Sequence, residues 1–540
     1  MPAAFLAYVF LIEVAPSAEP IARPNILIAI SDDQSYPHAS AYGEPVVQTP
    51  AFDRVARSGV LFNNAFTPCP GCSPMRAAFL TGQHVWQIRH AGTHASSFPK
   101  ELKTFTGELE KAGYRIGYTG KPWGPGNHRV SGWEQNPVGK SYSKLKTKSP
   151  PGISATDYAK NFEAFLDEQS STAGPFCFWY GGHEPHRSFE KGAGKKAGLD
   201  PASVRVPKFL PDSDEIRADL TDYYAEINWF DLHLGRMLDS LQERGILENT
   251  LVIVTSDNGM AFPRAKANLY EYGIHMPLAI AWQAGPVSGG IQEDALVSLL
   301  DVTATVYAAA DVAEPAGQPL SGRSLLPLLS QTTSAAEPNE SRQAVFAGRE
   351  RHSSSRFNSL GYPCRCVRTK EYLYIRNFKP ERWPAGPGQK YSSAKFNQAG
   401  ELVETTLGPA HGGYHDIDAC PSLSWMIANR EKPNVKPYFE AAVALRPAEE
   451  LYSIGNDPAC MVNLADSAEH AAELQLHRKI LMDELHRTGD LRAIAPDQGD
   501  EWETYPRYSG LRWFPIPQWA KENPSSVPEQ TWLDERRPRD

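Results

Sequence analysis

A cysteine with chemically informative neighbours at fixed spacing lies in the N-terminal part of the chain. Cys72 opens the segment Cys-Ser-Pro-Met-Arg, so that Pro74 and Arg76 follow it, and Leu-Thr-Gly comes shortly after. Proline is favoured in the first turn of a helix, and the residues from Arg76 onwards are mostly good helix formers. Cys72 is therefore predicted to lie just before a helix N-terminus, where free N–H groups and the helix dipole favour an anion.

The same cysteine also closes a Cys-x-x-Cys pattern with Cys69, which allows two other interpretations. Such a pair can be a redox centre or half of a zinc site. A redox pair should open a helix in a small thioredoxin-like unit, whereas this chain has 540 residues. A zinc site needs a second pair of similar spacing, and Cys364 and Cys366 are too close together to be a good one. A plain structural cysteine, the third interpretation, explains neither Pro74 nor Arg76.

Oxygen-bearing side chains follow two predicted buried strands. Asp32 and Asp33 end one apolar run, and Asp257 and Asn258 end another that is rich in β-branched residues. Adjacent carboxylates repel each other unless a cation lies between them, although a solvated turn also accounts for the first pair taken alone. Three carboxylates and one amide oxygen suit Ca²⁺, or less well Mg²⁺, better than zinc.

Basic and imidazole side chains follow two further predicted strands. Lys121 comes after a strand-end glycine, and His183, His186 and Arg187 follow a second apolar run. A lysine or a histidine in such a place is often merely exposed or structural. Open α/β sheets, however, bind their ligands at the carboxyl ends of the strands, so these residues are candidates for an active site.

The elements that must position these side chains alternate between strands and helices along the chain. Alternation of this kind, with continuous apolar runs for the strands, predicts an α/β fold with central parallel strands. Strands are expected at 25–31, 114–119, 176–180, 250–256 and 278–282, and helices at 49–59, 102–112, 220–241 and 299–307. A strand at 367–375 and a last helix at 471–486 are expected in the C-terminal part.

In their order and spacing these segments resemble the type I sulfatases of the alkaline-phosphatase superfamily. The Cys72 segment matches the signature in which a modifying enzyme oxidises the cysteine to formylglycine, and the Asp-Asp, His-x-Pro-His and Thr-Ser-Asp segments match in the same order. The resemblance covers roughly residues 24–330 well and the rest loosely. It implies an alkaline-phosphatase-like mixed sheet sandwiched by helices, with a smaller C-terminal α+β subdomain.

The resemblance also implies a role for each candidate residue. The hydrated aldehyde made from Cys72 would attack sulfur, while Arg76, Lys121 and Lys266 neutralise the sulfuryl charge and His183 protonates the leaving group. The implied metal ligands are Asp32, Asp33, residue 72, Asp257 and Asn258. His186 and Arg187 would contact the sugar; a scaffold role, in which Arg187 braces an acidic residue, is equally compatible with the sequence.

One position departs from the family pattern. In the family a histidine commonly follows the lysine that corresponds to Lys121, and this chain has Trp123 where that histidine is expected. His128 and His90 are the candidates that could substitute for it.

Within the family, the segments around Asn258 are most similar to the heparan N-sulfatases, which act on N-sulfoglucosamine, and bacterial enzymes for algal sulfated polysaccharides share these features. The resemblance implies hydrolysis of a sulfamate or sulfate ester of a sulfated saccharide, with an algal O-sulfate as the second choice. It also implies a formylglycine-generating or an anaerobic sulfatase-maturating enzyme as partner. A phosphatase or phosphodiesterase of the superfamily and a non-catalytic glycan-binding protein are the other hypotheses.

Composition limits the remaining classes. With 41% hydrophobic residues, 22% charged residues and a formal charge of −9, the chain is typical of soluble globular proteins and lacks the basic excess of nucleic-acid binders. A catalytic domain at 23–335 and a C-terminal subdomain at 346–495 are expected, separated by the Ser-, Thr-, Pro- and Glu-rich segment 331–342. No function is assigned to the tail at 496–540.

The N-terminal segment 1–22 is predicted to be a signal peptide. The apolar run 5–12 is long enough for a signal core and too short to cross a membrane, although no Lys or Arg precedes Arg23. A strand or a disordered segment is the alternative. No other stretch is apolar for long enough to span a membrane, so a periplasmic or secreted protein is expected.

Overall fold

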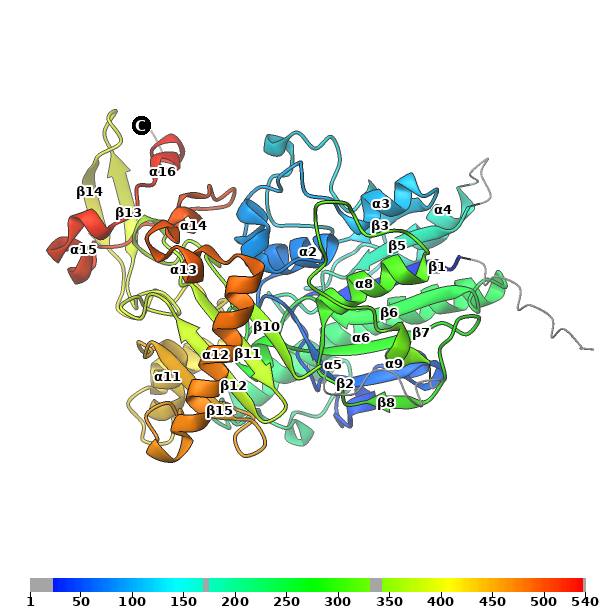
Figure 1. Cartoon of the computed structure of the whole chain (residues 1–540). Coiled ribbons are helices and arrows are strands. Elements are labelled where there is room, and N and C mark those ends of the chain that lie inside the picture. Colours follow the sequence, from blue (N-terminus) through cyan, green and yellow to red (C-terminus); the bar gives the residue numbers. More distant parts are fainter. Residues whose placement is uncertain (1–22, 169–173, 331–341, 538–540) are drawn as a thin grey trace, which may run out of the picture.

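The structure, a computed structural model, describes residues 23–168, 174–330 and 342–537 (Figure 1). Its largest element is a nine-stranded mixed sheet in the order β4-β3-β5-β1-β6-β7-β2-β8, with β9 paired to β2. The strands are β1 (Asn25–Ser31), β2 (Val60–Phe66), β3 (Arg115–Gly120), β4 (Lys140–Ser141), β5 (Phe176–Gly181), β6 (Thr250–Ser256), β7 (His275–Ala281), β8 (Ile291–Glu293) and β9 (Val297–Ser298).

The four central strands β3, β5, β1 and β6 run parallel to one another. Their continuous apolar sequences are explained by burial on both faces of the sheet. β7 is antiparallel to both β6 and β2, which makes the sheet mixed, as expected. The carboxyl ends of the four parallel strands therefore meet at one edge of the sheet.

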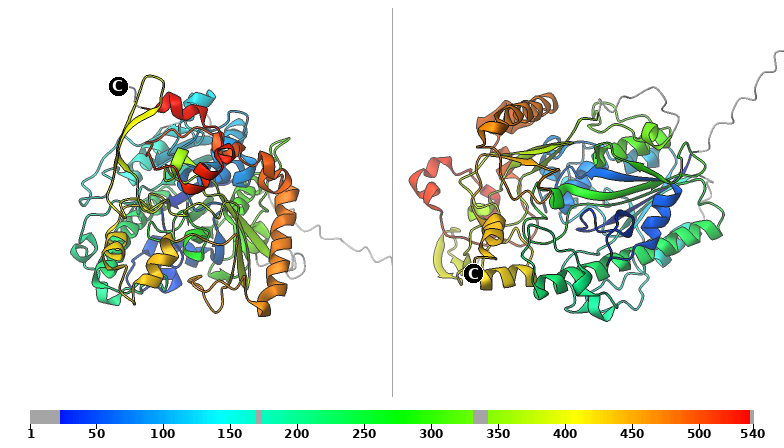
Figure 2. Two further views of the ribbon diagram at one scale, coloured as in Figure 1. Left: turned by 90° about the vertical axis from the view of Figure 1, so that its left-hand side faces the viewer. Right: turned by 90° about the horizontal axis from the view of Figure 1, so that it is seen from below.

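Helices cover both faces of this sheet (Figure 2). α2 (Cys72–Thr81), α3 (Phe105–Lys111) and α8 (Leu299–Ala309) pack on one face, and α1 (Pro50–Ser58), α4 (Tyr158–Asp167) and most of the C-terminal half of α6 (Asp214–Glu243) pack on the other. Successive side chains of a strand point to opposite faces, so Ile26, Ile28 and Ile30 enter the first core while Leu27 and Ala29 enter the second. The expected sandwich is confirmed.

A second, four-stranded antiparallel sheet belongs to the C-terminal part, with α12 (Ala471–Thr488) packed against it (Figure 1). Its order is β10 (Ala344–Arg349), β11 (Cys364–Thr369), β12 (Tyr372–Asn377) and β15 (Glu449–Ser453). The single strand predicted at 367–375 was wrong, because the polar pair Lys370 and Glu371 forms a turn between β11 and β12. High β-propensity on both sides of the pair hides this turn in the sequence.

The remaining elements are short. They are α5 (Ala193–Lys196), α7 (Glu271–Ile274), α9 (Leu326–Leu329), the hairpin of β13 (Tyr391–Phe396) and β14 (Leu402–Leu407), α10 (Pro421–Asn429), α11 (Lys436–Val443), α13 (Leu491–Ile494), α14 (Glu501–Thr504), α15 (Gln518–Glu522) and α16 (Thr531–Arg536). The hairpin and the last helices gather at the end of the molecule far from β8 (Figure 1).

Capping side chains explain where predicted and observed helix starts differ. α3 begins at Phe105 and not at residue 102, because the Thr104 hydroxyl accepts a hydrogen bond from the Gly107 N–H at 3.2 Å. α6 is longer than predicted, since it starts after Ser213, which caps it in the same way. α2 includes Cys72 as its first residue, and Gly71 is its N-cap.

Two predicted segments lie wholly or mainly outside the described residues. These are the signal peptide at 1–22 and, apart from its last residue, the boundary segment at 331–342. On either side of the latter, α9 ends at Leu329 and β10 begins at Ala344, slightly before the predicted start of the subdomain at 346. Across the described ranges, no helix has the length and apolar character needed to cross a membrane.

Candidate active site

The carboxyl ends of the parallel strands bring the predicted site residues together. Asp32 follows β1, Lys121 follows β3, His183 lies two residues beyond β5, and Asp257 follows β6. The strands are in register at this edge, with Ile30 opposite Gly181. The site is thus assembled from segments far apart in the sequence, in the place where open α/β sheets bind ligands.

Two glycines allow the strand ends to approach this closely. A Cβ on Gly181 would lie 1.9 Å from the Lys121 carbonyl oxygen, and a Cβ on Gly120 would lie 2.0 Å from the Gly181 carbonyl oxygen. Gly120 also has a φ of +75°, a conformation that other residues rarely adopt. Any larger side chain would push Lys121 out of the site.

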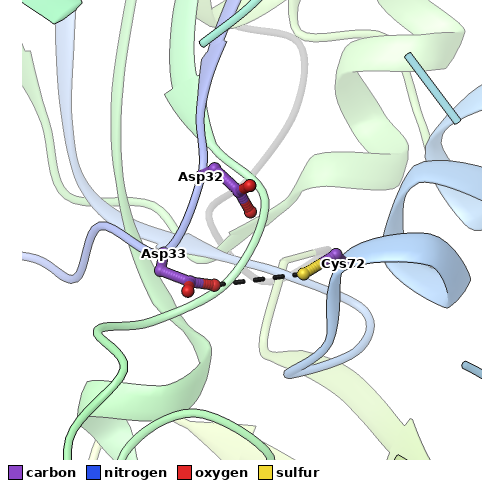
Figure 3. A group of neighbouring side chains, drawn as sticks. All are labelled: Asp32, Asp33 and Cys72. Carbon is purple, nitrogen blue, oxygen red and sulfur yellow. Dashed lines mark hydrogen bonds between the residues drawn. The ribbon is translucent and has the colours of Figure 1, made fainter. Parts of the chain in front are cut away.

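The acidic residues form one buried hydrogen-bonded group. Asp33 has a φ of +77°, and its backbone N–H donates a hydrogen bond to Asp257 Oδ1 at 3.1 Å. Its Oδ1 accepts a hydrogen bond from the side-chain nitrogen of Asn258 at 2.7 Å. Side-chain atoms of Asp32, Asp33 and Cys72 that could bind a metal all lie within 4.8 Å of one another (Figure 3). Three of the five predicted metal ligands thus face a common point.

Cys72 lies at the N-terminus of α2, with its Sγ 4.0 Å from Asp33 Oδ1 (Figure 3). Its side chain is buried, and burial raises the pKa of the thiol far above its ordinary value, although Lys121 and Lys266 oppose the shift. The thiol is therefore protonated at neutral pH. An unmodified Cys72 is a poor nucleophile here, because the thiolate is the reactive form.

The two alternative interpretations of the Cys-x-x-Cys pattern find no support. Burial also raises the pKa of Cys69, and all seven cysteines, each in a described part of the chain, are buried and unpaired. The described residues hold no disulfide at this pattern, and no group of possible metal ligands among them includes Cys69.

Two buried lysines neutralise the carboxylates. Lys121 contacts Asp32, while Lys266 Nζ lies 2.7 Å from Asp33 Oδ2 and 3.0 Å from Asp418 Oδ2. Burial alone would lower the pKa of Lys266, but the Asp33 and Asp418 charges hold it well above the ordinary value. Both lysines are therefore charged and can meet an anion at this edge.

Arg76 braces the site from within α2. Its Nε donates to Asp257 Oδ2 at 2.8 Å and its Nη1 donates to the Lys121 carbonyl at 2.8 Å, and the side chains of Arg76 and Asp257 are completely buried. Burial raises the pKa of Asp257 to about 6 even though Arg76 acts to lower it, with Asp32 adding to the rise. Burial thus raises the pKa of Asp257 by more than the guanidinium beside it lowers that pKa.

A metal ion that binds oxygen fits the arrangement. Asp32 Oδ1 and Asn258 Oδ1 are buried and have no hydrogen-bond partner within the described ranges. Buried acceptors without partners are costly, and a cation between them would satisfy both. The residues Asp32, Asp33, Asp257 and Asn258 offer only oxygen, the donor that Ca²⁺ and Mg²⁺ prefer.

The two histidines after β5 have different surroundings. His183 is exposed to solvent and its ring has no hydrogen-bond partner in the described part of the chain, and partial desolvation by the surrounding residues lowers its pKa to about 4 against the opposing charge of Asp32. His186 is partly exposed, with Nε2 3.9 Å from Asp33 Oδ2 and Nδ1 2.6 Å from the Arg187 carbonyl. Both therefore lie at the site, as the sequence predicted.

Arg187 binds an acidic residue of the scaffold, which is the second of the two roles that the sequence allowed. Its Nη1 and Nη2 donate to the two carboxylate oxygens of Asp219, each at 2.8 Å, and its Nε donates to the Ala261 carbonyl at 2.7 Å. The side chain is 5% exposed, so its guanidinium is largely committed to the scaffold.

The histidine expected at position 123 is not replaced by either candidate from the sequence. Trp123 is buried and packs edge-on against Phe98, with ring centroids 5.2 Å apart. His128 lies beside Trp123 at 6.4 Å, and His90 bonds to the Ser97 hydroxyl at 2.9 Å. Among the described residues, no contact of either histidine with a predicted site residue is found.

Three further residues reach the site and were missed by sequence reasoning. Asp418 bonds to Lys266, and His94 and His352 lie near the N-terminus of α2. Each belongs to a loop without a recognisable motif, so neither spacing nor periodicity indicated them. The only available signal was the expectation of a histidine that Trp123 does not supply.

Comparison with known proteins gives consistent results. The sulfatase family model matches residues 24–312. The chain is 30% identical over 511 residues to N-sulphoglucosamine sulphohydrolase of Homo sapiens, an alignment that covers 88% of this chain and 93% of that protein. It is 26% identical over 483 residues to an ulvan-active sulfatase of Formosa agariphila, covering 87% and 81% respectively.

Solved structures share the fold. A complex with the substrate D-glucosamine-2-N,6-O-disulfate has a TM-score of 0.60 at 19% identity, covering 88% of this chain and 99% of that chain. The phosphonate monoester hydrolase of Agrobacterium radiobacter has a TM-score of 0.56 at 18% identity, covering 88% and 97%. Resemblance at this level of identity establishes the architecture and nothing finer.

Proposed function

We propose, on the premise that this chain belongs to the sulfatase family, that it removes sulfate from N-sulfated glucosamine through a formylglycine made from Cys72. The observation that carries the proposal is the single buried cluster at the strand ends. There Cys72, at a helix N-terminus, lies within 4.8 Å of metal-binding carboxylates and beside two charged lysines.

The residues of the chain divide into those that hold a cation and those that meet the substrate. Asp32, Asp33, Asp257 and Asn258 would hold Ca²⁺, with Mg²⁺ as the second choice, together with an oxygen on residue 72. When present, the metal ion polarises the sulfuryl oxygens and the hydrated aldehyde offers the attacking oxygen.

Charge on the sulfuryl group would be met by lysines and by the helix terminus. Lys121 and Lys266 are buried and charged, and the N-terminal N–H groups of α2 point toward the same place. Preorganised donors of this kind stabilise developing negative charge without reorganisation during the reaction. Arg76 keeps Asp257 and the Lys121 loop in position.

His183 is the proposed proton donor to the leaving nitrogen or oxygen. Its pKa of about 4 before substrate binds means that the ring is neutral at pH 7. A bound sulfuryl group would raise this pKa, because an adjacent negative charge favours the protonated imidazolium. His183 is thus suited to gain a proton as substrate binds and to release it as the bond breaks.

The choice of substrate rests on the relatives. N-sulphoglucosamine sulphohydrolase matches almost the full length of both chains, which supports an N-sulfated glucosamine at a non-reducing end. The ulvan-active sulfatase supports O-sulfated algal saccharides as the second candidate. His186, next to the carboxylates and partly exposed, is the proposed contact to the sugar.

Maturation and location complete the proposal. Conversion of Cys72 requires a formylglycine-generating enzyme or an anaerobic sulfatase-maturating enzyme as a partner during synthesis. We propose that the mature protein is located in the periplasm or outside the cell, because the apolar segment near its N-terminus resembles the core of a signal peptide.

A panel of defined sulfated sugars tests the substrate. Protein in which residue 72 has been confirmed as the aldehyde by mass spectrometry should release sulfate from N-sulfoglucosamine. Release only from O-sulfated algal oligosaccharides would contradict the N-sulfated substrate and leave a sulfatase. Faster turnover of an aryl phosphate than of an aryl sulfate would favour a phosphatase, and binding of sulfated sugars without turnover would indicate a glycan-binding protein.

A further inference from the structure

Two histidines from distant loops lie beside the N-terminus of α2. A Cβ on Gly71, the residue before Cys72, would lie 3.1 Å from Nδ1 of His352, so this imidazole packs directly against the helix start. The ring of His94 follows behind it, with a centroid distance of 4.7 Å. The Ala95 N–H donates to the Ser73 hydroxyl at 3.0 Å, which fixes the His94 loop to the same helix turn.

The His352 ring lacks a partner of its own. Its side chain is 6% exposed, and the only hydrogen bond of this residue within the described ranges uses its carbonyl oxygen. A ligand at the N-terminus of α2 could supply the missing hydrogen bond.

The charges around the pair are those of the active site. Burial lowers the pKa of His352 to about 3, with Asp416 opposing the shift and Lys266 adding to it. The pKa of His94 is also well below its ordinary value through burial, the neighbouring His352 and Arg507. Both rings are therefore neutral, and a neutral imidazole has one N–H to donate.

The C-terminal tail holds the two loops together. Arg507 Nη1 donates to the His352 carbonyl at 3.0 Å and lies 3.4 Å from the carbonyl and from Nδ1 of His94. Arg351 Nη1 donates to the Tyr505 carbonyl at 2.7 Å, and the Tyr508 N–H donates to the Ala95 carbonyl at 2.6 Å. Tail residues 505–508 thus connect the His94 loop to the segment that carries His352.

We propose that His352 is a further catalytic residue, whose imidazole N–H donates to an oxygen of the sulfuryl group bound at the N-terminus of α2. His94 and Arg507 are positioning residues that fix the ring. The proposal rests on the proposed function, and it gives the tail a role in the reaction. It also supplies the imidazole that Trp123, packed into the core, does not provide.

The test compares His352→Ala with the matched controls His90→Ala and His128→Ala, which alter the histidines that the sequence offered instead. Each variant is loaded with calcium and checked for the aldehyde at residue 72 and for its melting temperature. Two quantities are measured: turnover of the sulfated sugar, and the affinity for inorganic sulfate by titration calorimetry. Sulfate affinity is informative even if no sugar in the panel is hydrolysed.

For His352→Ala we expect kcat to fall about 10²-fold, as for loss of one preorganised donor, with sulfate bound roughly tenfold more weakly. The two controls should stay within about twofold of the protein without substitutions, in both turnover and sulfate affinity. A folded His352→Ala that keeps its sulfate affinity would overturn the proposal. If the protein without substitutions, carrying the aldehyde at residue 72, releases no sulfate from any sugar, the proposed function fails. Sulfate affinity alone then decides the role of His352.

Arg507 provides the second, independent variant, should His352→Ala fail to fold. Arg507→Met should lower kcat and weaken sulfate binding while KM for the sugar changes little, because the ring shifts without loss of a sugar contact. Arg507→Lys should recover part of the sulfate affinity, since a lysine can still donate to the loop carbonyls. Equal sulfate affinities in both Arg507 variants and in the unmodified sequence would show that the tail does not position the ring.

Discussion

The two sides of the site are built in different ways. The metal side consists of Asp32, Asp33, Asp257 and Asn258 at the ends of adjacent strands. All four residues are buried, and Asp33 is hydrogen-bonded to Asp257 and to Asn258. The opposite side consists of Asp418, His352 and Arg507, which come from C-terminal loops and the tail. Strand ends position the oxygen atoms that could bind a cation, while loops and the tail from the second part of the chain form the rest of the site. The two sides of the site thus depend on different kinds of structure, with strand ends on one side and long loops on the other.

The difference is also one of charge. On the metal side the three carboxylates are paired with Lys121, Lys266 and Arg76, and the oxygens of Asp32 and Asn258 that lack a partner among the described residues are the acceptors that a metal ion would satisfy. The C-terminal side instead presents neutral imidazoles and one carboxylate, Asp418, that is 31% exposed and shared with Lys266. Changes on the metal side should therefore abolish the reaction, and changes on the other side should reduce it.

The largest effect is expected from Asp257→Asn. Loss of this carboxylate removes a metal ligand and the partner of Arg76, so kcat should fall by more than about 10³-fold and calcium affinity should fall with it. Removal of metal from the protein without substitutions by a chelator should have the same effect, and calcium should restore activity better than zinc. The exposed Asp212→Asn serves as control. Full activity after exhaustive chelation would contradict the metal side as described.

Asp418→Asn should have a moderate effect. Lys266 would keep Asp33 but lose its second carboxylate, and loss of such a supporting partner costs about 10–100-fold. We expect kcat/KM to fall within this range while the calcium affinity stays unchanged. A loss of calcium binding equal to that of Asp257→Asn would mean that the two sides are not separate.

Trp123→His tests whether restoring the family residue restores its role. The indole is buried against Phe98, so the substitution should lower stability by about 2–4 kcal/mol through lost packing and a buried polar ring. No increase of kcat is expected, because the side chain points into the core. Denaturant unfolding and turnover at saturating substrate measure the two quantities. A several-fold gain in kcat would show that the new imidazole reaches the substrate and would weaken the case for His352.

Glu226 in α6 is a buried carboxyl group that is not paired with a cation in the described part of the chain, and its pKa is raised as a result. Substitution of Glu226 is expected to change stability and not activity. Burial, with Glu184 and Asp222 nearby, raises its pKa to about 9, and its Oε1 has no hydrogen-bond partner among the described residues. The folded state keeps this proton up to about pH 9, while the unfolded chain loses it near the ordinary value of 4.5. Stability therefore falls as pH rises between these values, by at most about 1.4 kcal/mol per unit.

Glu226→Gln removes that dependence. The melting temperature should rise at pH 8 and stay close to that of the unmodified sequence at pH 5, so the difference between the two proteins grows with pH. Identical pH profiles of melting temperature for the two proteins would show that the Glu226 carboxyl is ionised in the folded state.

The contrast explains how much could be predicted from sequence. The parallel strands and the residues directly after them were correct, because an apolar run fixes a strand and its end fixes the position of Asp32 or Asp257. The turn at Lys370 and the start of α3 were missed, since they depend on a polar pair and on a capping hydroxyl. Asp418 and His352 could not be predicted, because no local pattern specifies where a long loop returns.

Arg187 illustrates a third case, in which the sequence allowed two roles. A guanidinium forks as readily onto a scaffold carboxylate as onto a substrate, and only the fold places Asp219 within 2.8 Å of it. For such residues the surroundings in space decide the role, whatever the motif.

The central claim is that residue 72 acts as an aldehyde at the N-terminus of α2. The most direct measurement is sulfate release by protein co-expressed with a maturating enzyme, made in parallel with mass spectrometry of the residue-72 peptide. Activity should rise in proportion to the fraction of aldehyde, and Cys72→Ala, which keeps the carboxylate and amide ligands but has no attacking oxygen, should release no sulfate. Equal sulfate release from fully unmodified protein, or from Cys72→Ala, would contradict the account.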